Sequence, residues 1–274
     1  MPTVLSRRFS AGLAIPLALA ALIAVVAVAP VLVTRKSPLA SDPRRVLRPP
    51  SAAHLFGTDQ IGRDVLARIV HGARYSLSVG VGAIVLAALI GIVIGTLSGL
   101  APRVIDEAVI RSLDVLNAFP EVLLALVVIA IVGPGPLNVV VAIGVAAIPR
   151  FARVVRAQVF VLRRSGWMEV AVTQGLSYPR RVVKHIVPNV LGPVVALATV
   201  GTGTAVIAAA GLSFLQLGPK PPTPEWGSML SESRDYISLG WWLGVFPGLA
   251  ILFTVTVITV LGRRLQRRFE GRPR

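Results

Sequence analysis

Apolar residues run along the chain in five long stretches that contain no Asp, Glu, Lys or Arg. These stretches cover residues 11–34, 75–102, 122–149, 185–219 and 236–262. A helix needs about 20 apolar residues to cross a hydrocarbon core of about 30 Å. Each stretch is long enough, so the pattern predicts an all-α protein that crosses a membrane several times.

The middle stretch has Gly133-Pro134-Gly135-Pro136 at its centre. Two prolines and two glycines together would leave backbone groups without hydrogen bonds in the middle of a bilayer. We therefore expect a turn here, with one helix over about 104–132 and another over about 137–162. This division predicts six transmembrane helices.

Six spans place both termini on one side of the membrane, and the positive-inside rule selects that side. With cytoplasmic N- and C-termini, 18 Lys and Arg residues lie inside and 10 outside. If residues 133–136 were only a kink, five spans with an external N-terminus would give 22 inside and 6 outside. Charge alone favours that alternative, whereas the double Gly-Pro pair favours six spans with both termini in the cytoplasm.

The first apolar stretch has some features of a secretory signal peptide. Arg7 and Arg8 precede it, and residues 27–29 resemble a cleavage site. However, the stretch is longer than the roughly 7–15 apolar residues of such a peptide, and Pro30 disfavours cleavage after residue 29. Residues 1–34 are therefore expected to form a cytoplasmic tail and an uncleaved first span.

Composition also points to a membrane protein. Of the 274 residues, 54% are hydrophobic and 15% charged, and the mean hydropathy is +0.77, whereas soluble domains have roughly 25% charged residues. This excludes a soluble enzyme and a disordered chain. The net charge of +16 would suggest nucleic acid for a soluble chain, but arginines at membrane surfaces explain it here. The chain has no Cys, which excludes disulfides and thiolate metal sites.

Residues 35–74 form a polar segment that the six-span topology places outside the cell. Val65, Ile69 and Val70 fall at helical spacing, which predicts a short amphipathic helix on the membrane surface. His54 and His71 belong to no cluster of potential ligands, so we expect no metal site.

The segment 163–188 has the pattern of a helix, a turn and a second helix. Ala171 and Gly175 are four residues apart and form a small-residue face that another backbone could approach closely. Gly175 suits the residue after a helix end. Ser177 suits the N-cap of the second helix, with Pro179 in its first turn.

Two arginines, Arg180 and Arg181, follow near the N-terminus of that second helix. The helix dipole disfavours cations there, so their placement suggests a partner outside the chain. Acidic groups on another protein and lipid headgroups are equally consistent with it. Pro188 is expected to end this helix.

These residues resemble a known loop. Glu169-x-Ala171-x-x-x-Gly175 followed by Ile186-Val187-Pro188 is similar to the E-A-A-x-x-x-G…I-x-L-P cytoplasmic loop of bacterial ABC importer permeases, with Val170 and Val187 where Ala and Leu are usual. Further motifs, in order along the chain, resemble the second ("C") permease subunit of the dipeptide/oligopeptide/nickel importer family. They cover residues 54–64, 72–77, 118–120, 185–190, 212–218 and 221–227.

The resemblance implies a type I importer permease fold with a five-helix core over 75–262 and a basic cytoplasmic tail over 263–274. It also implies a multi-pass location in the bacterial cytoplasmic membrane. The partners would be a homologous permease in a heterodimer, two ABC ATPase subunits and an extracytoplasmic solute-binding protein, with no nucleic acid. The function would be ATP-driven import of dipeptides or oligopeptides.

In such a permease the segment 163–188 would be the coupling helix, seated in a groove on an ATPase. The resemblance implies that Glu169 fixes it by a hydrogen bond or ion pair and that Ala171 and Gly175 allow close packing. Pro188 would set the angle of return into the membrane. Ser177, Arg180 and Arg181 complete the set of expected contact residues.

The chain itself is not expected to be an enzyme. A Walker A motif needs a Gly-Lys pair, whose Lys reaches the β/γ-phosphates. None of Lys36, Lys184 and Lys220 follows a Gly. We therefore expect no cofactor or metal in this chain, and ATP and Mg²⁺ on the partner ATPases.

Four prolines stiffen the loop 218–235, which the topology places outside. Pro222, Pro224 and Trp226, together with Asp59, are candidates for contact with the solute-binding protein. The alternative is that this loop packs as a lid on its own bundle.

Asp114 and Glu121 are seven residues apart on the predicted helix 104–132 and would share a face. Carboxylates within a span often mark function. Because these two lie toward the cytoplasmic end, beside Arg111 and the next helix's Arg153, we expect structural ion pairs rather than a proton site.

Two other classes of protein remain as alternatives. A secondary transporter driven by an ion gradient needs an ion site at mid-membrane and usually an internal repeat, and the sequence shows neither. A membrane enzyme needs a catalytic cluster, and His54, Asp59 and Asp64 lack an evident nucleophile. Within the importer family the substrate stays open among dipeptides, longer peptides, glutathione, nickel chelates and some sugars.

Overall fold

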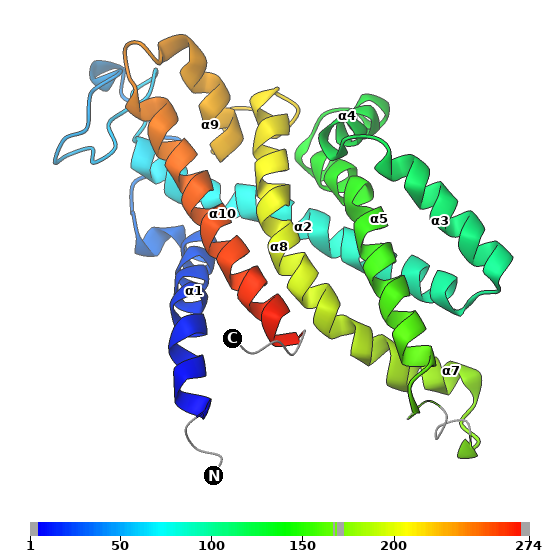
Figure 1. The fold of residues 1–274 in the computed structure, drawn as a ribbon. Coiled ribbons are helices and arrows are strands. Elements are labelled where there is room, and N and C mark those ends of the chain that lie inside the picture. Colours follow the sequence, from blue (N-terminus) through cyan, green and yellow to red (C-terminus); the bar gives the residue numbers. More distant parts are fainter. Residues whose placement is uncertain (1–4, 167, 169–172, 270–274) are drawn as a thin grey trace.

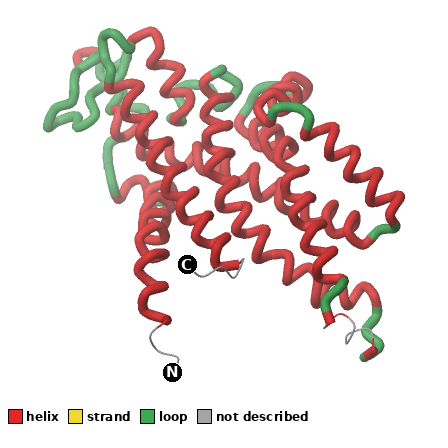
Figure 2. The backbone as a smooth tube through the Cα atoms, viewed as in Figure 1, coloured by secondary structure: helices red, strands yellow, loops and turns green. Residues whose placement is uncertain are grey.

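The computed structural model describes residues 5–166, 168 and 173–269. This part of the chain is built of helices and loops, with one isolated bridge between Thr58 and Asp64 (Figure 2). The elements are α1 (Leu5–Val28), η1 (Pro30–Leu32), η2 (Pro43–Arg45), α2 (Val65–Leu100), α3 (Arg103–Asn117), α4 (Glu121–Val132), α5 (Pro136–Arg163), α7 (Tyr178–Arg181), η3 (Val182–Ile186), α8 (Val187–Phe214), α9 (Trp226–Ser233), η4 (Arg234–Tyr236) and α10 (Trp242–Phe269).

Within the described residues, four helical segments are long and apolar enough to cross a bilayer: Val65–Leu100, Pro136–Arg163, Tyr178–Phe214 and Trp242–Arg267. α3 and α4 make a fifth only if they are counted together across a bend of 91°. The apolar part of α1, Leu13–Val28, is shorter. The all-α membrane fold is confirmed, and the number of six spans stays a prediction.

The expected single helix over 104–132 is wrong, because the chain bends sharply between α3 and α4. The bend lies at Ala118, Phe119 and Pro120. Pro120 has no N–H to continue the helical ladder, and its ring disfavours a helical conformation for the preceding residue. A new helix can begin directly after the proline, and α4 does so at Glu121.

The turn predicted at the double Gly-Pro pair is confirmed. α4 ends at Val132 and α5 begins at Pro136. Between them Gly133 and Gly135 have φ values of +90° and +146°. Residues with a Cβ rarely adopt such backbone angles. The N–H of Gly135 donates to the carbonyl of Leu217, 3.0 Å away, and ties this turn to the end of α8.

The separate amphipathic helix predicted within residues 35–74 is also wrong. Residues 65–74 are the first turns of α2, whose N-cap Asp64 accepts a hydrogen bond from the N–H of Ala67. Val65 and Ile69 are buried against Trp226 and Trp242 in a compact cluster. Val65 and Ile69 do lie on one apolar face of a helix, but residues of other helices cover that face.

Within the described chain, α2 and α5 share the most extensive contact of any two helices. Gly91, Gly95 and Gly99 are four residues apart and form a stripe on α2. A Cβ on Gly95 would overlap the carbonyl oxygen of Ala152 and lie 2.8 Å from Cβ of Val155. Such small-residue stripes let two helix backbones approach closely in membranes.

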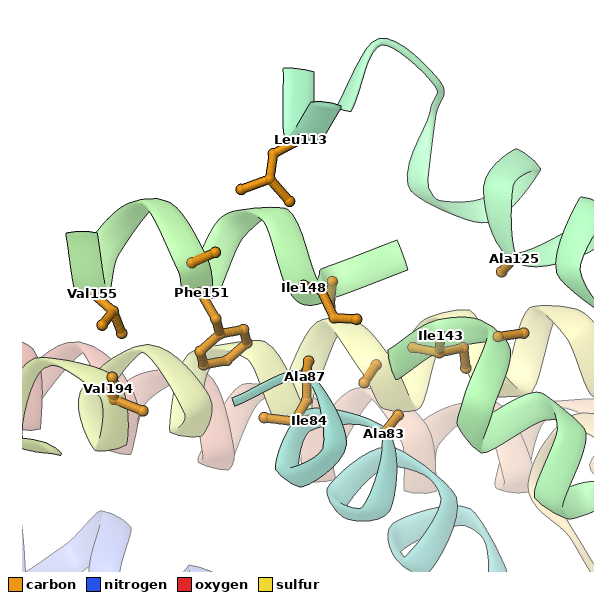
Figure 3. Close-up of a cluster of buried hydrophobic side chains, with 14 of the residues drawn as sticks. Ala83, Ile84, Ala87, Leu113, Ala125, Ile143, Ile148, Phe151, Val155 and Val194 are labelled. Carbon is orange, nitrogen blue, oxygen red and sulfur yellow. The ribbon is translucent and has the colours of Figure 1, made fainter. Parts of the chain in front are cut away.

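The main hydrophobic core lies where this pair meets the neighbouring helices (Figure 3). Ala87 of α2 lies near Phe151 of α5 and Ala83 lies near Ile143, and Leu113 of α3 and Val194 of α8 belong to the same cluster. Much of the outer apolar surface, such as Leu89 and Leu97 of α2, stays exposed. Large exposed apolar faces of this kind suit a lipid environment.

The segments that the sequence analysis singled out as candidates lie at two opposite ends of the bundle of long helices (Figure 1). The start of α1, the end of α10 and α7 lie toward one end. The loop lobe before α2 and the short helix α9 lie toward the other end. The two groups of residues singled out in the sequence are therefore far apart.

Candidate functional site

The described parts of the segment 163–188 lie at the end of the bundle that also holds the start of α1 and the end of α10 (Figure 1). It starts at the end of α5, contains α7 and η3, and continues into the start of α8. Glu169 and Ala171, two of its expected contact residues, lie outside the described residues. The others can be placed.

Gly175 adopts the left-handed backbone conformation, with φ of +71°. This is the conformation expected for a glycine that follows a helix end. Among the described residues, nothing lies within 4 Å of a Cβ placed at Gly175, and the residue is exposed. The space beside Gly175 is thus open for another molecule.

Ser177 takes the predicted N-cap position of α7, with Pro179 in the first turn, although the serine side chain makes no capping hydrogen bond. Arg180 is exposed. The guanidinium of Arg181 lies 5.5 Å from the centre of the Tyr178 ring. Gly175, Tyr178 and Arg180 are thus accessible, whereas Arg181 is half-buried.

Pro188 does not end the helix, contrary to the expectation. α7, η3 and α8 form one continuous helical segment over Tyr178–Phe214. η3 is a π-helical turn in which the N–H of Val187 donates to the carbonyl of Val182. The wider turn accommodates the proline ring that would clash with the carbonyl four residues earlier in an α-helix.

An ion pair between a buried carboxylate and a half-buried guanidinium connects the helices near the start of this segment. Asp106 of α3 accepts hydrogen bonds from Arg156 of α5, at 2.5 Å, and from Ser98 of α2, also at 2.5 Å. About two turns further along α5, Arg163 donates to the carbonyl of Gly99 at 2.7 Å. The last turns of α2 and α5 are thereby connected to the point where the segment 163–188 begins.

The structural ion pair expected for Asp114 is confirmed, since Arg153 lies 2.5 Å from it. The shared face with Glu121 is wrong, because Asp114 belongs to α3 and Glu121 starts α4 beyond the 91° bend. Glu121 is exposed, separate from this ion pair.

At the opposite end, most candidates for a contact with a binding protein are buried. Trp226 is only 3% exposed, and its indole N–H donates to the carbonyl of Ile69 at 2.9 Å. Pro224 and Asp59 are also buried, and Pro222 alone of the four is exposed. The alternative holds for this loop: α9 packs as a lid on its own bundle.

Glu225 anchors this lid. Its side chain caps α9 by accepting hydrogen bonds from the N–H groups of Gly227 and Ser228, and it accepts a third from the hydroxyl of Ser76 on α2. The side chain is fully buried, and every one of these donors is part of α2 or α9.

A network of four charged side chains joins α9 to the loop before α2 and to the first turn of α2. Asp59 lies 2.5 Å from Nε of Arg63 and 3.5 Å from Nη1 of Arg68. Glu232 of α9 lies 3.0 Å from Arg63 and 3.2 Å from Arg68. Two carboxylates and two guanidinium groups balance each other, which offsets the cost of their burial.

We expect Arg68→Ala to destabilise the protein by about 3 kcal/mol, because Glu232 and Asp59 would stay buried with half of their positive charge removed. Arg74→Ala is the matched control, since Arg74 lies on the same helix and is exposed. It should change stability by less than about 0.5 kcal/mol. Thermal unfolding of the purified chain measures both, and equal shifts would contradict a structural role for the network.

Asp64, directly before α2, forms ion pairs with a second group of polar side chains. Lys36 lies 2.7 Å and Nδ1 of His54 2.9 Å from its Oδ2. Burial raises the pKa of Asp64, but hydrogen bonds from Lys36, the N–H of Ala67 and His54 outweigh it and hold the pKa below its usual value. His71 instead contacts the carbonyl of Ala67 within its own helix.

Residues 91–274 match the protein family described as "Binding-protein-dependent transport system inner membrane component". The match covers α2 from Gly91 onward and all later elements. It includes the segment 163–188 and the lid.

Similar proteins align over most of the chain. The dipeptide transport system permease protein DppC of Alkalihalophilus pseudofirmus is 42% identical over 86% of this chain and 77% of its own length. The di/tripeptide transport system permease protein DppC of Pseudomonas aeruginosa is 39% identical over 81% of this chain and 75% of its own. The glutathione transport system permease protein GsiD of Pectobacterium atrosepticum is 40% identical over 82% and 75%.

Among solved structures, the fold is similar to a chain of the MetNI methionine ABC transporter in an inward-facing conformation. The TM-score is 0.58 at 20% sequence identity, with 73% of this chain and 95% of that chain covered. At this identity the likeness concerns the fold alone, and it agrees with the type I importer permease architecture.

Proposed function

This chain belongs to the family of binding-protein-dependent transport system inner membrane components, and from that premise we propose that it forms half of a pathway for peptides. It is a permease subunit of an ABC importer and a multi-pass membrane protein. In such importers separate ATPase subunits hydrolyse ATP. The proposal concerns the substrate, the other half of the pathway and the way this chain is driven.

The observation that carries the mechanism is the unbroken helix from the exposed segment into the centre of the bundle. Tyr178–Phe214 has 37 residues and is therefore about 55 Å long. Its exposed end would sit in a groove on an ATPase, with Gly175 leaving space for close contact. Its other end meets the turn at Gly135 through Leu217.

When the two ATPases bind ATP and close, they would displace this helix as a rigid body. Because α8 packs against α2, α5, α9 and α10, its displacement would change the packing on both sides of the pathway. A bundle with two stable packings converts such a movement into a switch between inward- and outward-facing states. Arg180 and Arg181 would contact acidic groups of the ATPase.

The substrate is proposed to be a dipeptide or oligopeptide. Relatives at about 40% identity are described as dipeptide and di/tripeptide permeases, and one as a glutathione permease. Glutathione is itself a tripeptide, which makes it the first alternative, followed by nickel chelates. An ion-coupled secondary transporter is the alternative from another class.

The remaining parts of the assembly follow from this proposal. A homologous permease would complete the pathway as a heterodimer, two ATPases would bind ATP and Mg²⁺, and a solute-binding protein would deliver the substrate. Six spans in the bacterial cytoplasmic membrane, with both termini in the cytoplasm, would place segment 163–188 inside. That arrangement is supported by its position at the same end as the start of α1 and the end of α10 (Figure 1).

Reconstitution tests the proposal. The chain is purified with the homologous permease, the ATPases and the binding protein encoded beside it, and the complex is placed in liposomes. We expect accumulation of a labelled dipeptide that requires ATP and the binding protein, with glutathione and a nickel chelate as competing substrates. Uptake by this chain alone, driven by an ion gradient, would contradict the proposal.

A further inference from the structure

Arg150 is an exposed basic residue halfway along α5, one of the helices long and apolar enough to cross a bilayer. It lies 14 residues after Pro136 and 13 before Arg163, and is thus about 21 Å from the start of the helix. Of residues 138–156, all of which the structure describes, only Arg150 is exposed. The middle of α5 is therefore covered by its own chain except at this side chain.

The neighbouring helix places Arg150 at a similar depth. Phe151, the next residue, lies near Ala87 of α2 (Figure 3), and a Cβ on Gly91 would overlap Cβ of Phe151. Gly91 is 16 residues from one end and 9 from the other of 75–100, the part of α2 without Asp, Glu, Lys or Arg. These separations correspond to about 24 Å and about 14 Å. A long basic side chain reaches the membrane surface from positions near a helix end, and Arg150 is far from both ends.

The two arginines that follow on α5 have acidic partners within the chain. Arg153 lies 2.5 Å from Asp114, and Arg156 lies 2.5 Å from Asp106. Arg150 makes no hydrogen bond or ion pair with the described part of the chain. α5 thus carries one guanidinium whose counter-charge has to come from another molecule.

The chemistry of that molecule follows from the position of Arg150. Charged side chains at this depth face the interior of a bundle or a water-filled cavity, because lipid does not solvate them, and they pair with an opposite charge. The planar guanidinium fork matches a carboxylate, which it can bind through two parallel hydrogen bonds. A peptide with a free C-terminus carries one such carboxylate, ionised at neutral pH. Glutathione carries one as well.

We propose that Arg150 lies on the wall of the translocation pathway and binds the C-terminal carboxylate of the peptide as it passes. The inference rests on the proposed function, which supplies the pathway and the peptide. A carboxylate that leaves water for an apolar pathway loses its hydration, and the guanidinium replaces part of it. Because the site is exposed and has a single charge, the peptide can leave it again, as transport requires.

The first test exchanges the charge at this position. The chain has no Cys, so Arg150→Cys introduces a single thiol. The complete importer is assembled in liposomes with partner subunits whose cysteines are replaced by serine. Methanethiosulfonate reagents then attach either an ethylammonium or an ethylsulfonate group to the thiol. Leu89→Cys is the control, because Leu89 is 61% exposed and close to Gly91 on α2, but has apolar surroundings.

We expect unmodified Arg150→Cys to take up about tenfold less labelled dipeptide per ATP hydrolysed than the native importer, since a charge-assisted hydrogen bond is lost. Ethylammonium should restore most of the uptake and ethylsulfonate none. The thiol should react at least about tenfold faster than that of Leu89→Cys. Native uptake by the unmodified variant, equal restoration by both reagents, or a reaction as slow as that of the control would each overturn the proposal.

The second test identifies the owner of the carboxylate, which could also be the homologous permease. A dipeptide is selected whose C-terminal amide also binds the solute-binding protein by calorimetry and is taken up by the native importer. Arg150→Gln should lower uptake of the free dipeptide about tenfold and uptake of its amide less than about twofold. Equal losses for the two peptides would overturn the proposal, because Arg150 would then act on a protein group.

The proposed function and the role of Arg150 fail in different ways. ATP-driven uptake is measured first with the native importer. If the native importer takes up no peptide, the proposed function fails, and the role of Arg150 fails with it. If the native importer takes up peptide and Arg150→Gln does so at the same rate, only the role of Arg150 is wrong.

Discussion

Leucine in place of Gly95 should prevent α2 and α5 from packing and should cost at least about 3 kcal/mol of stability. Even a single Cβ added at this position would overlap the carbonyl oxygen of Ala152 and lie 2.8 Å from Cβ of Val155. The obstacle is backbone, so no change of rotamer relieves it. The helix pair would have to separate, which would also pull the guanidinium of Arg163 on α5 away from the carbonyl of Gly99 on α2.

The matched control is Gly248→Leu. Gly248 lies within α10, and a Cβ there would meet nothing within 4 Å. This variant should unfold at the native temperature or slightly above, because leucine favours a helix more than glycine does. The midpoint of thermal unfolding of the purified chain measures both. A Gly95→Leu midpoint as high as that of Gly248→Leu would exclude the glycine stripe as the basis of packing.

Replacement of Gly175 by leucine should reduce substrate uptake at least about tenfold while ATP hydrolysis by the assembled importer continues. Leucine would fill the open space beside the turn, where we propose that the ATPase packs, and it would strain a backbone with φ of +71°. The measurement is the number of substrate molecules taken up per ATP hydrolysed. Normal uptake would count against the coupling role.

A second substitution separates the two causes. Asparagine tolerates the left-handed conformation but still adds a side chain of similar size. If Gly175→Asn loses coupling as leucine does, the space is needed for the partner. If Gly175→Asn transports normally, coupling requires the left-handed turn and does not require the open space beside it.

Two errors in the sequence prediction concern the effect of proline on a helix. The bend at Pro120 could have been predicted, because a proline disfavours a helical conformation of the residue before it, here Phe119. The same rule applied to Pro188 gave the wrong result, because a π-helical turn absorbed the ring. Whether a proline breaks a helix depends on whether the neighbouring turns can widen, and packing decides that.

The glycine stripe is a signal that the sequence contained and that the prediction did not use. Gly91, Gly95 and Gly99 at intervals of four residues within an apolar stretch are typical of close helix packing in membranes. Which helix packs on the stripe is not encoded in the spacing. The structure identifies it as α5.

The sequence by itself determined the helical membrane class, the turn at Gly133–Pro136, the conformation at Gly175 and the family, since each depends on residues close together in the chain. Tertiary structure alone decided that Trp226 and Asp59 are buried and that α9 forms a lid. Arg68 and Glu232, for example, are 164 residues apart. Burial and charge pairing between such distant residues arise only when the helices pack, because no local preference of the chain specifies which side chains will meet.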